Sequence, residues 1–93
     1  MRTIERAASF RRDYKREAKG LYRESLDEML ASILWALTND QLLDARYKDH
    51  ALIGNFAGYR ECHLKPDFLL IYKKSDEHIL RLARLGSHSV LFG

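Results

Sequence analysis

The chain has very little of the residues that mark disulfide-stapled or multidomain proteins, with one cysteine and one proline in 93 residues. The single cysteine, Cys62, cannot form an internal disulfide bond, and its apolar surroundings favour a buried thiol in a reducing compartment. No repeat, low-complexity tract or proline-rich linker is visible. We therefore expect one domain spanning residues 1–93.

Long apolar runs and cofactor motifs are also absent. The N-terminal segment is charged from its second residue, and no window approaches the roughly 18 apolar residues that cross a bilayer. This pattern predicts a cytoplasmic protein with no membrane partner. The histidines lack the spacing of metal ligands, and there is no glycine-rich phosphate loop or serine nucleophile elbow. We expect no metal and no cofactor.

Basic charge is present, and it is concentrated near the N-terminus. The formal net charge is +3 and the sequence pI about 9.2, yet residues 1–20 alone hold seven basic side chains against three acidic ones. A polyanion is a natural partner for such a segment, and Arg12, Lys15 and Arg16 are candidate RNA contacts. Solvated charge and an acidic protein partner are the alternatives.

The hydrophobic pattern changes once, near residue 40. Before it, apolar residues recur at helical spacing through 10–18 and again through 26–37, which predicts two helices packed as a hairpin. After residue 58, apolar segments at 59–64, 68–73 and 78–85 alternate with polar turns and predict an antiparallel meander.

The segment 68–72 is apolar at every position, as in a central strand that is covered on both faces. A short strand at 2–5 would add an edge. The predicted fold is α+β, with an N-terminal helical hairpin packed on a small antiparallel sheet. The polar segment 39–55 is a long loop, and loops of that length are usually functional.

An acid and an imidazole share one face of the strand at 59–64. Side chains alternate along a strand, so Glu61 and His63 point to the same side. The carboxylate can fix the tautomer of the imidazole and raise its basicity, which is the relation that a general base requires. A plain charge pair on the surface is the alternative.

Further candidates for chemistry lie in loops and at strand ends. Arg84 and His88 are four residues apart where the last long strand ends, a place where sites tend to form. The guanidinium can hold a phosphate and the imidazole can protonate a leaving oxygen. His50 and Asp67 lie in two other polar segments. Taken singly, each residue also fits a solvated surface.

Together these residues form a specific linear combination. The chain resembles the YafQ-like branch of the RelE/ParE toxin superfamily over residues 47–93. The positions that carry the resemblance are Tyr47–His50, Gly58–Arg60, His63, Pro66–Asp67, Leu70–Tyr72, Arg84, Gly86, His88 and Leu91–Gly93.

The resemblance implies the toxin of a bacterial type II toxin–antitoxin pair. It implies a ribosome-dependent endoribonuclease that cuts messenger RNA in the ribosomal A site, and we expect this cleavage to need no metal. The catalytic residues implied are His50, His63, Asp67, Arg84 and His88. Phe92 and Glu61 would contact the substrate, and Glu61 is a departure, because this branch commonly has an aspartate there. Implied partners are a cognate antitoxin, messenger RNA, ribosomal RNA of the 70S ribosome and, through the antitoxin only, operator DNA.

The expected mechanism is proton transfer by histidines at a phosphodiester. One histidine or Asp67 would remove the ribose 2′-OH proton and another histidine would protonate the departing 5′ oxygen, with His88 essential. Arg84 would stabilise the phosphorane, and Phe92 would stack on a base. Two alternatives remain: a toxin that acts on DNA gyrase, as the ParE branch does, and a non-catalytic RNA- or protein-binding module.

Overall fold

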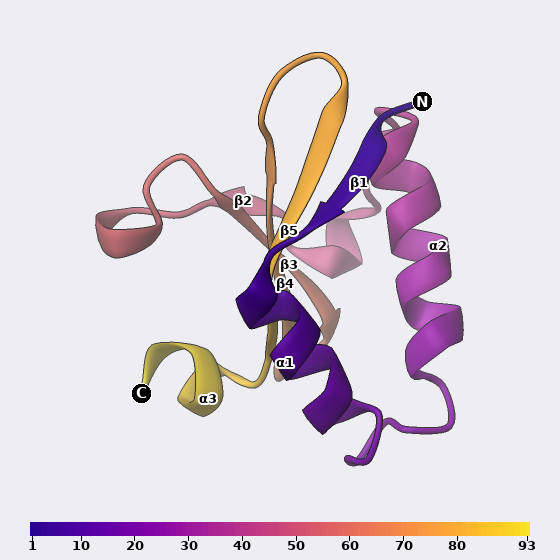
Figure 1. Ribbon diagram of the computed structural model, residues 1–93, viewed down its shortest axis with the longest axis vertical. Helices are drawn as coiled ribbons and strands as arrows, with labels where there is room; N and C mark the ends of the chain where they lie inside the picture. The colour runs from indigo at the N-terminus through magenta and orange to yellow at the C-terminus, as the bar shows by residue number, and fades with distance from the viewer.

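A five-stranded sheet with the strand order β1-β5-β4-β3-β2 runs through the centre of the molecule. The computed structural model describes all of residues 1–93. In chain order the elements are β1 (Thr3–Arg6), α1 (Ala8–Glu17), α2 (Leu26–Thr38), η1 (Ala45–Tyr47), β2 (His50–Ala51), η2 (Gly54–Phe56), β3 (Arg60–Lys65), β4 (Phe68–Lys74), β5 (Ile79–Gly86) and α3 (His88–Phe92) (Figure 1).

The α+β prediction is confirmed, with one difference at the edge of the sheet. Strands β2 to β5 are antiparallel neighbours, as the meander predicts. Strand β1 instead pairs in parallel with β5, with Thr3 beside Ile79. Tight turns force antiparallel pairing, whereas the long connection through both helices and three strands allows β1 to run in the same direction as β5. The sheet is therefore mixed.

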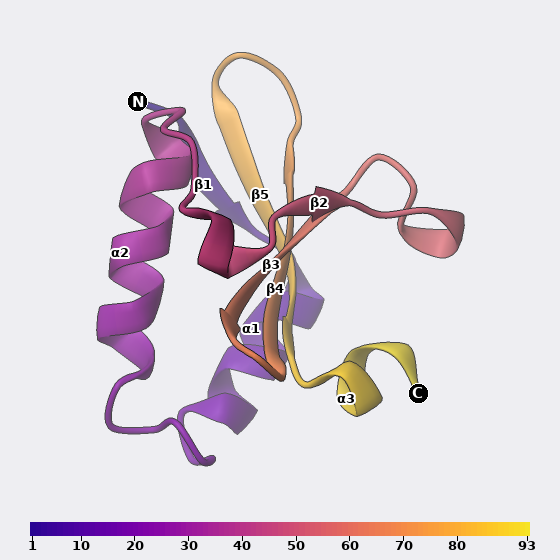
Figure 2. The same cartoon turned by 180° about the vertical axis from the view of Figure 1, so that it is seen from behind.

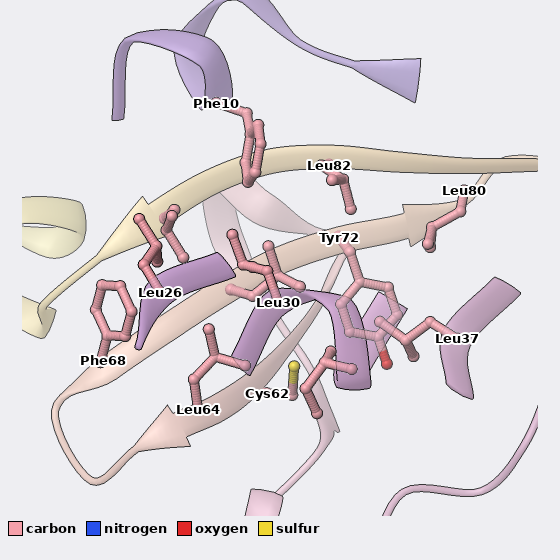
Figure 3. Packing of buried hydrophobic residues seen from close by; sticks show 13 residues of the cluster. Phe10, Leu26, Leu30, Leu37, Cys62, Leu64, Phe68, Tyr72, Leu80 and Leu82 are labelled. Atoms are coloured by element: carbon pink, nitrogen blue, oxygen red, sulfur yellow. The ribbon is translucent and has the colours of Figure 1, made fainter. Parts of the chain in front are cut away.

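The two long helices cover one face of the sheet. Helix α1 lies against β5 and α2 lies against β3, and both contribute apolar side chains to one core of 13 buried residues. Figure 3 shows Leu30 and Leu37 lying close to Tyr72 and Cys62 in this core. The helices are joined at one end and diverge toward the other, so they form an open hairpin (Figure 1). No helix is both long and apolar enough to span a bilayer.

The central strand β4 is buried on both faces, as its unbroken apolar sequence predicts. Leu69 and Ile71 belong to a second core with Ala83 and Leu91, on the face opposite to the long helices. Helix α3 and the segment that follows β2 cover this face, and Figure 2 shows both on the side of the molecule away from α2. Glu61 is directly opposite Ile71, so its side chain lies on this second face.

Candidate active site

Glu61 on β3 joins two of the histidines. Its side chain is buried, with 4% of the residue exposed, and its Oε2 atom lies 3.2 Å from Nε2 of His50 and 3.2 Å from Nε2 of His63. Strand pairing sets this arrangement, because His50 on β2 is directly opposite Glu61 and alternation places His63 on the same face. The predicted Glu61–His63 contact is confirmed.

Both imidazoles also have an oxygen acceptor at their second nitrogen. Nδ1 of His50 lies 2.7 Å from the Lys48 carbonyl oxygen, and Nδ1 of His63 lies 3.2 Å from the Pro66 carbonyl oxygen. A ring donates from both nitrogens at once only when it carries both protons. The contacts around Glu61 therefore fix the orientation of both rings through both of their nitrogens.

Asp67 and His88 form a second pair beside this cluster. Oδ1 of Asp67 accepts from the His88 backbone N–H at 2.9 Å and from Nδ1 of the same ring at 2.6 Å. The backbone N–H of His88, with the imidazole second, holds the pKa of Asp67 below its usual value. The structure gives Nε2 of His88 no protein partner, so this nitrogen can exchange protons with a ligand.

The rings of the site form a row that ends at Phe92. Ring centroids are 6.2 Å apart between His50 and His63, 5.5 Å between His63 and His88, and 6.5 Å between His88 and Phe92. Phe92 in turn meets Phe56 edge to face at 5.8 Å. His50, His88 and Phe92 are exposed, and exposed rings offer surfaces on which unstacked bases can lie.

Arg84 lies on β5 and its guanidinium is held by an acid that sequence reasoning missed. Its Nε donates to Oδ2 of Asp13 at 2.6 Å, and Arg16 donates to the other oxygen of the same carboxylate at 2.9 Å. Asp13 is fully buried. Its position three residues after the core residue Phe10 was the only signal, since that spacing puts both side chains on one face of α1.

The three candidate RNA-contact residues of α1 have different environments. Arg12 and Lys15 are exposed and form no hydrogen bond with the site residues, so the structure does not bring them to the histidines. Arg16 bonds to Asp13 and to the Leu85 carbonyl oxygen. The residues that the structure does bring together are His50, Glu61, His63, Asp67, His88 and Phe92.

Three of these residues have the donor atoms for a metal ion. One ligand atom each from His50, Glu61 and His63 lies within 4.8 Å of the other two. Two imidazoles and a carboxylate are a ligand set that suits zinc or copper. Such an ion would be held by the Nε2 atoms of the two histidines and by a carboxylate oxygen of Glu61.

Comparisons with known proteins identify the family of the chain. Residues 2–93 match a protein-family model described as a bacterial toxin of a type II toxin-antitoxin system, YafQ. The mRNA interferase toxin YafQ of Escherichia coli is 39% identical over 92 residues, which cover 97% of this chain and 99% of the relative.

Solved structures give the same result. The E. coli DinJ–YafQ complex contains a chain with a TM-score of 0.85 and 39% identity, and the match covers all of both chains. A metal-bound toxin from Helicobacter pylori has a TM-score of 0.82 and 42% identity, with 99% of this chain and all of that one covered.

Fold, site and relatives define a bacterial toxin of a type II toxin–antitoxin system. Because the family model matches nearly the whole sequence, the chain belongs to the YafQ family, which confirms the resemblance seen in its sequence.

Proposed function

We propose that this toxin is an mRNA interferase, an endoribonuclease that cuts messenger RNA on the ribosome by acid–base chemistry without a metal. The observation that carries the proposal is the Asp67–His88 pair, whose ring lies 5.5 Å from the Glu61-bound ring of His63. Two proton-transfer groups side by side are what transesterification at a phosphodiester needs. The activity named for the E. coli relative is of this kind.

In the proposed reaction the ribose 2′ oxygen attacks phosphorus while the bond to the 5′ oxygen breaks. His88 exchanges a proton through its free Nε2, because Asp67 occupies Nδ1. The second proton transfer falls to His50 or His63, which Glu61 holds in place. One proton leaves the 2′ hydroxyl and one is given to the 5′ oxygen, so the products are a 2′,3′-cyclic phosphate and a free 5′ hydroxyl.

Other side chains would bind the substrate and the ribosome. Arg84 would contact the scissile phosphate, and Phe92 would stack on a base. Arg12 and Lys15, exposed on α1, would meet ribosomal RNA by charge. The ribosome would supply orientation of the message, which lowers the barrier by holding the reacting atoms in line.

A cognate antitoxin is the second expected partner. The E. coli relative forms a complex with DinJ. We infer that an antitoxin of similar role binds this toxin in the cytoplasm, covers the row of rings, and connects the complex to operator DNA.

The test is induction of wild type and His88→Ala in a bacterial host, with messenger RNA 5′ ends mapped. We expect in-frame cuts by the wild type and a loss of about 100-fold to 10,000-fold in the variant, the range for removal of a general acid or base. His78→Ala, exposed in the β4–β5 turn, is the matched control and should cut normally. Growth arrest with intact messenger RNA would overturn the nuclease proposal and favour gyrase as the target.

A second candidate property is binding of a transition metal by His50, Glu61 and His63, which the metal-bound H. pylori relative favours. Because the ion would displace the ring protons, it would inhibit cleavage. Calorimetry with zinc or copper tests this: binding should disappear in His63→Ala, and unchanged binding there would exclude the site.

A further inference from the structure

Asp13 is a charged residue with no exposed surface, and all of its partners are donors. Oδ2 accepts from Nε of Arg84 at 2.6 Å and from the backbone N–H of Leu85 at 3.0 Å. Oδ1 accepts from Nη1 of Arg16 at 2.9 Å and, more weakly, from Nη2 of Arg84 at 3.4 Å. The carboxylate of α1 thus holds both a side chain and the backbone of β5.

A buried carboxylate is unfavourable unless such donors compensate it. Burial by itself would raise the pKa of Asp13, but the hydrogen bonds from Arg84, from the Leu85 N–H and from Arg16 outweigh burial and lower it. The group is therefore an anion in the folded protein. Removing Asp13 would leave Arg84 without an acceptor, and removing Arg84 would take away the shortest hydrogen bond to Asp13, so the positions of the two side chains depend on one another.

The strand is irregular at this point. Ile71 pairs with Arg84, but the next residue of β4, Tyr72, pairs with Leu82, so β5 has one extra residue there. Such bulges change the direction of a side chain, and they need support because they interrupt the ladder. Asp13 provides that support at the bulge, and Arg16 adds to it by donating from Nη2 to the Leu85 carbonyl oxygen at 2.8 Å.

The bonds leave part of the Arg84 guanidinium available. Asp13 takes Nε at short distance and Nη2 at long distance, while Nη1 has no protein partner, and 21% of the side chain is exposed. An arginine that is fixed through one edge can still present its other N–H groups to an anion. A fixed guanidinium loses little freedom when the phosphate arrives.

We propose that Asp13 is a positioning residue for cleavage, which orients Arg84 toward the scissile phosphate through the buried carboxylate–guanidinium contact. This inference rests on the proposed function, in which Arg84 binds that phosphate. A residue of α1 would thus help to position a catalytic side chain on β5, although the two elements are far apart in the sequence. The alternative is that the pair only stabilises the fold.

A double-mutant cycle separates the two roles. We expect Asp13→Asn to lower kcat about tenfold to 100-fold, with KM within about twofold, because a small misplacement of a catalytic group has effects of that size. Arg84→Ala should lose about 100-fold to 1,000-fold, as when one transition-state donor is removed. In the Arg84→Ala background, Asp13→Asn should have no further effect on kcat, because the residue that it positions is gone.

Chemical rescue of cleavage activity is an independent test, because a purely structural role of Asp13 would not affect it. Methylguanidinium added to Arg84→Ala can occupy the vacated place on Asp13, and we expect it to restore part of the activity. It should restore none in Asp13→Asn/Arg84→Ala. The matched control is Asp40→Asn, which removes an exposed carboxylate that also binds two cations, those of Arg2 and Lys74, and should leave kcat unchanged.

All rates are measured well below the lowest melting temperature of the set. If Asp13→Asn lowers kcat by the same factor in the wild-type and Arg84→Ala backgrounds, the inference is overturned and the proposed function is not affected. If Arg84→Ala cleaves at the wild-type rate, the proposed role of Arg84 is wrong, and the inference about Asp13 fails with it. Should Asp13→Asn fail to fold, Arg84→Lys replaces it, since lysine keeps the charge but lacks the Nε edge. A loss of at least about tenfold in Arg84→Lys supports the inference, and full activity refutes it.

Discussion

Replacing Glu61 by glutamine is the most informative change to the histidine cluster. Both imidazoles contact the same oxygen of Glu61, Oε2, at 3.2 Å. An amide oxygen placed there can accept from both rings, so Glu61→Gln keeps the number of hydrogen bonds and removes the charge. The variant therefore measures what the charge contributes to holding His50 and His63.

The size of the effect follows from these two bonds. A hydrogen bond to a charged group is roughly twice as strong as a neutral one, which contributes about 1 kcal/mol, so each bond weakens by about 1 kcal/mol. Two bonds give about 2 kcal/mol, or a cleavage rate about 30-fold lower at 1.36 kcal/mol per tenfold. The free energy of unfolding should change less, because neutralising Glu61 also removes its desolvation cost.

The assay is single-turnover cleavage of a short message on purified ribosomes, with thermal unfolding of each variant in parallel. Glu61→Asp keeps the charge on a shorter side chain and should retain more activity than Glu61→Gln. Glu77→Gln, in an exposed turn, is the matched control. A Glu61→Gln rate within twofold of wild type would refute the reasoning, as would equal losses for the aspartate and glutamine variants.

Three further predictions follow from burial and charge. Because the pKa of Asp13 is lowered in the folded protein, the unfolded chain takes up a proton at a higher pH than the folded chain does. Urea unfolding should therefore show that the stability falls as the pH drops below about 4, the region of the unfolded carboxyl pKa. The stability of Asp13→Asn should fall less. Burial raises the pKa of Cys62 to about 12, so a thiol reagent at pH 8 should react only after unfolding; rapid labelling of the folded protein would contradict this. Removing both Arg12 and Lys15 should reduce the salt dependence of ribosome binding by a slope of about 1.4, and an unchanged slope would exclude α1 as an RNA contact.

Strands β3 and β4 could be predicted from sequence because β3 alternates between its two faces and β4 is apolar at successive positions. Cys62 is apolar and turned toward the helices, which leaves Glu61 and His63 on the other face. The run from Phe68 to Tyr72 is too apolar for any position to face solvent. Where local pattern and burial agree, sequence alone is sufficient.

The contacts that could not be predicted are tertiary. Strand β1 has too few apolar residues to indicate its partner, and its parallel direction depends on the path of the chain through both helices. A carboxylate among basic residues looks solvated, and the helical spacing from Phe10 alone is too weak a signal to predict the burial of Asp13. Asp67 meets His88 only because pairing of β4 with β5 places Leu69 beside Gly86.

The central place of β5 affects how the toxin is made. It pairs with β1 and β4 and supports α1, although it is the last strand to be synthesised. While β5 is still inside the ribosome, β1 has no neighbouring strand, and Asp13 lacks the donors from Arg84 and Leu85. Folds that depend on such distant contacts form slowly, and only when the whole set is present. A growing chain therefore cannot hold the site together, and the contacts of Arg84 and His88 form only after β5 has left the ribosome.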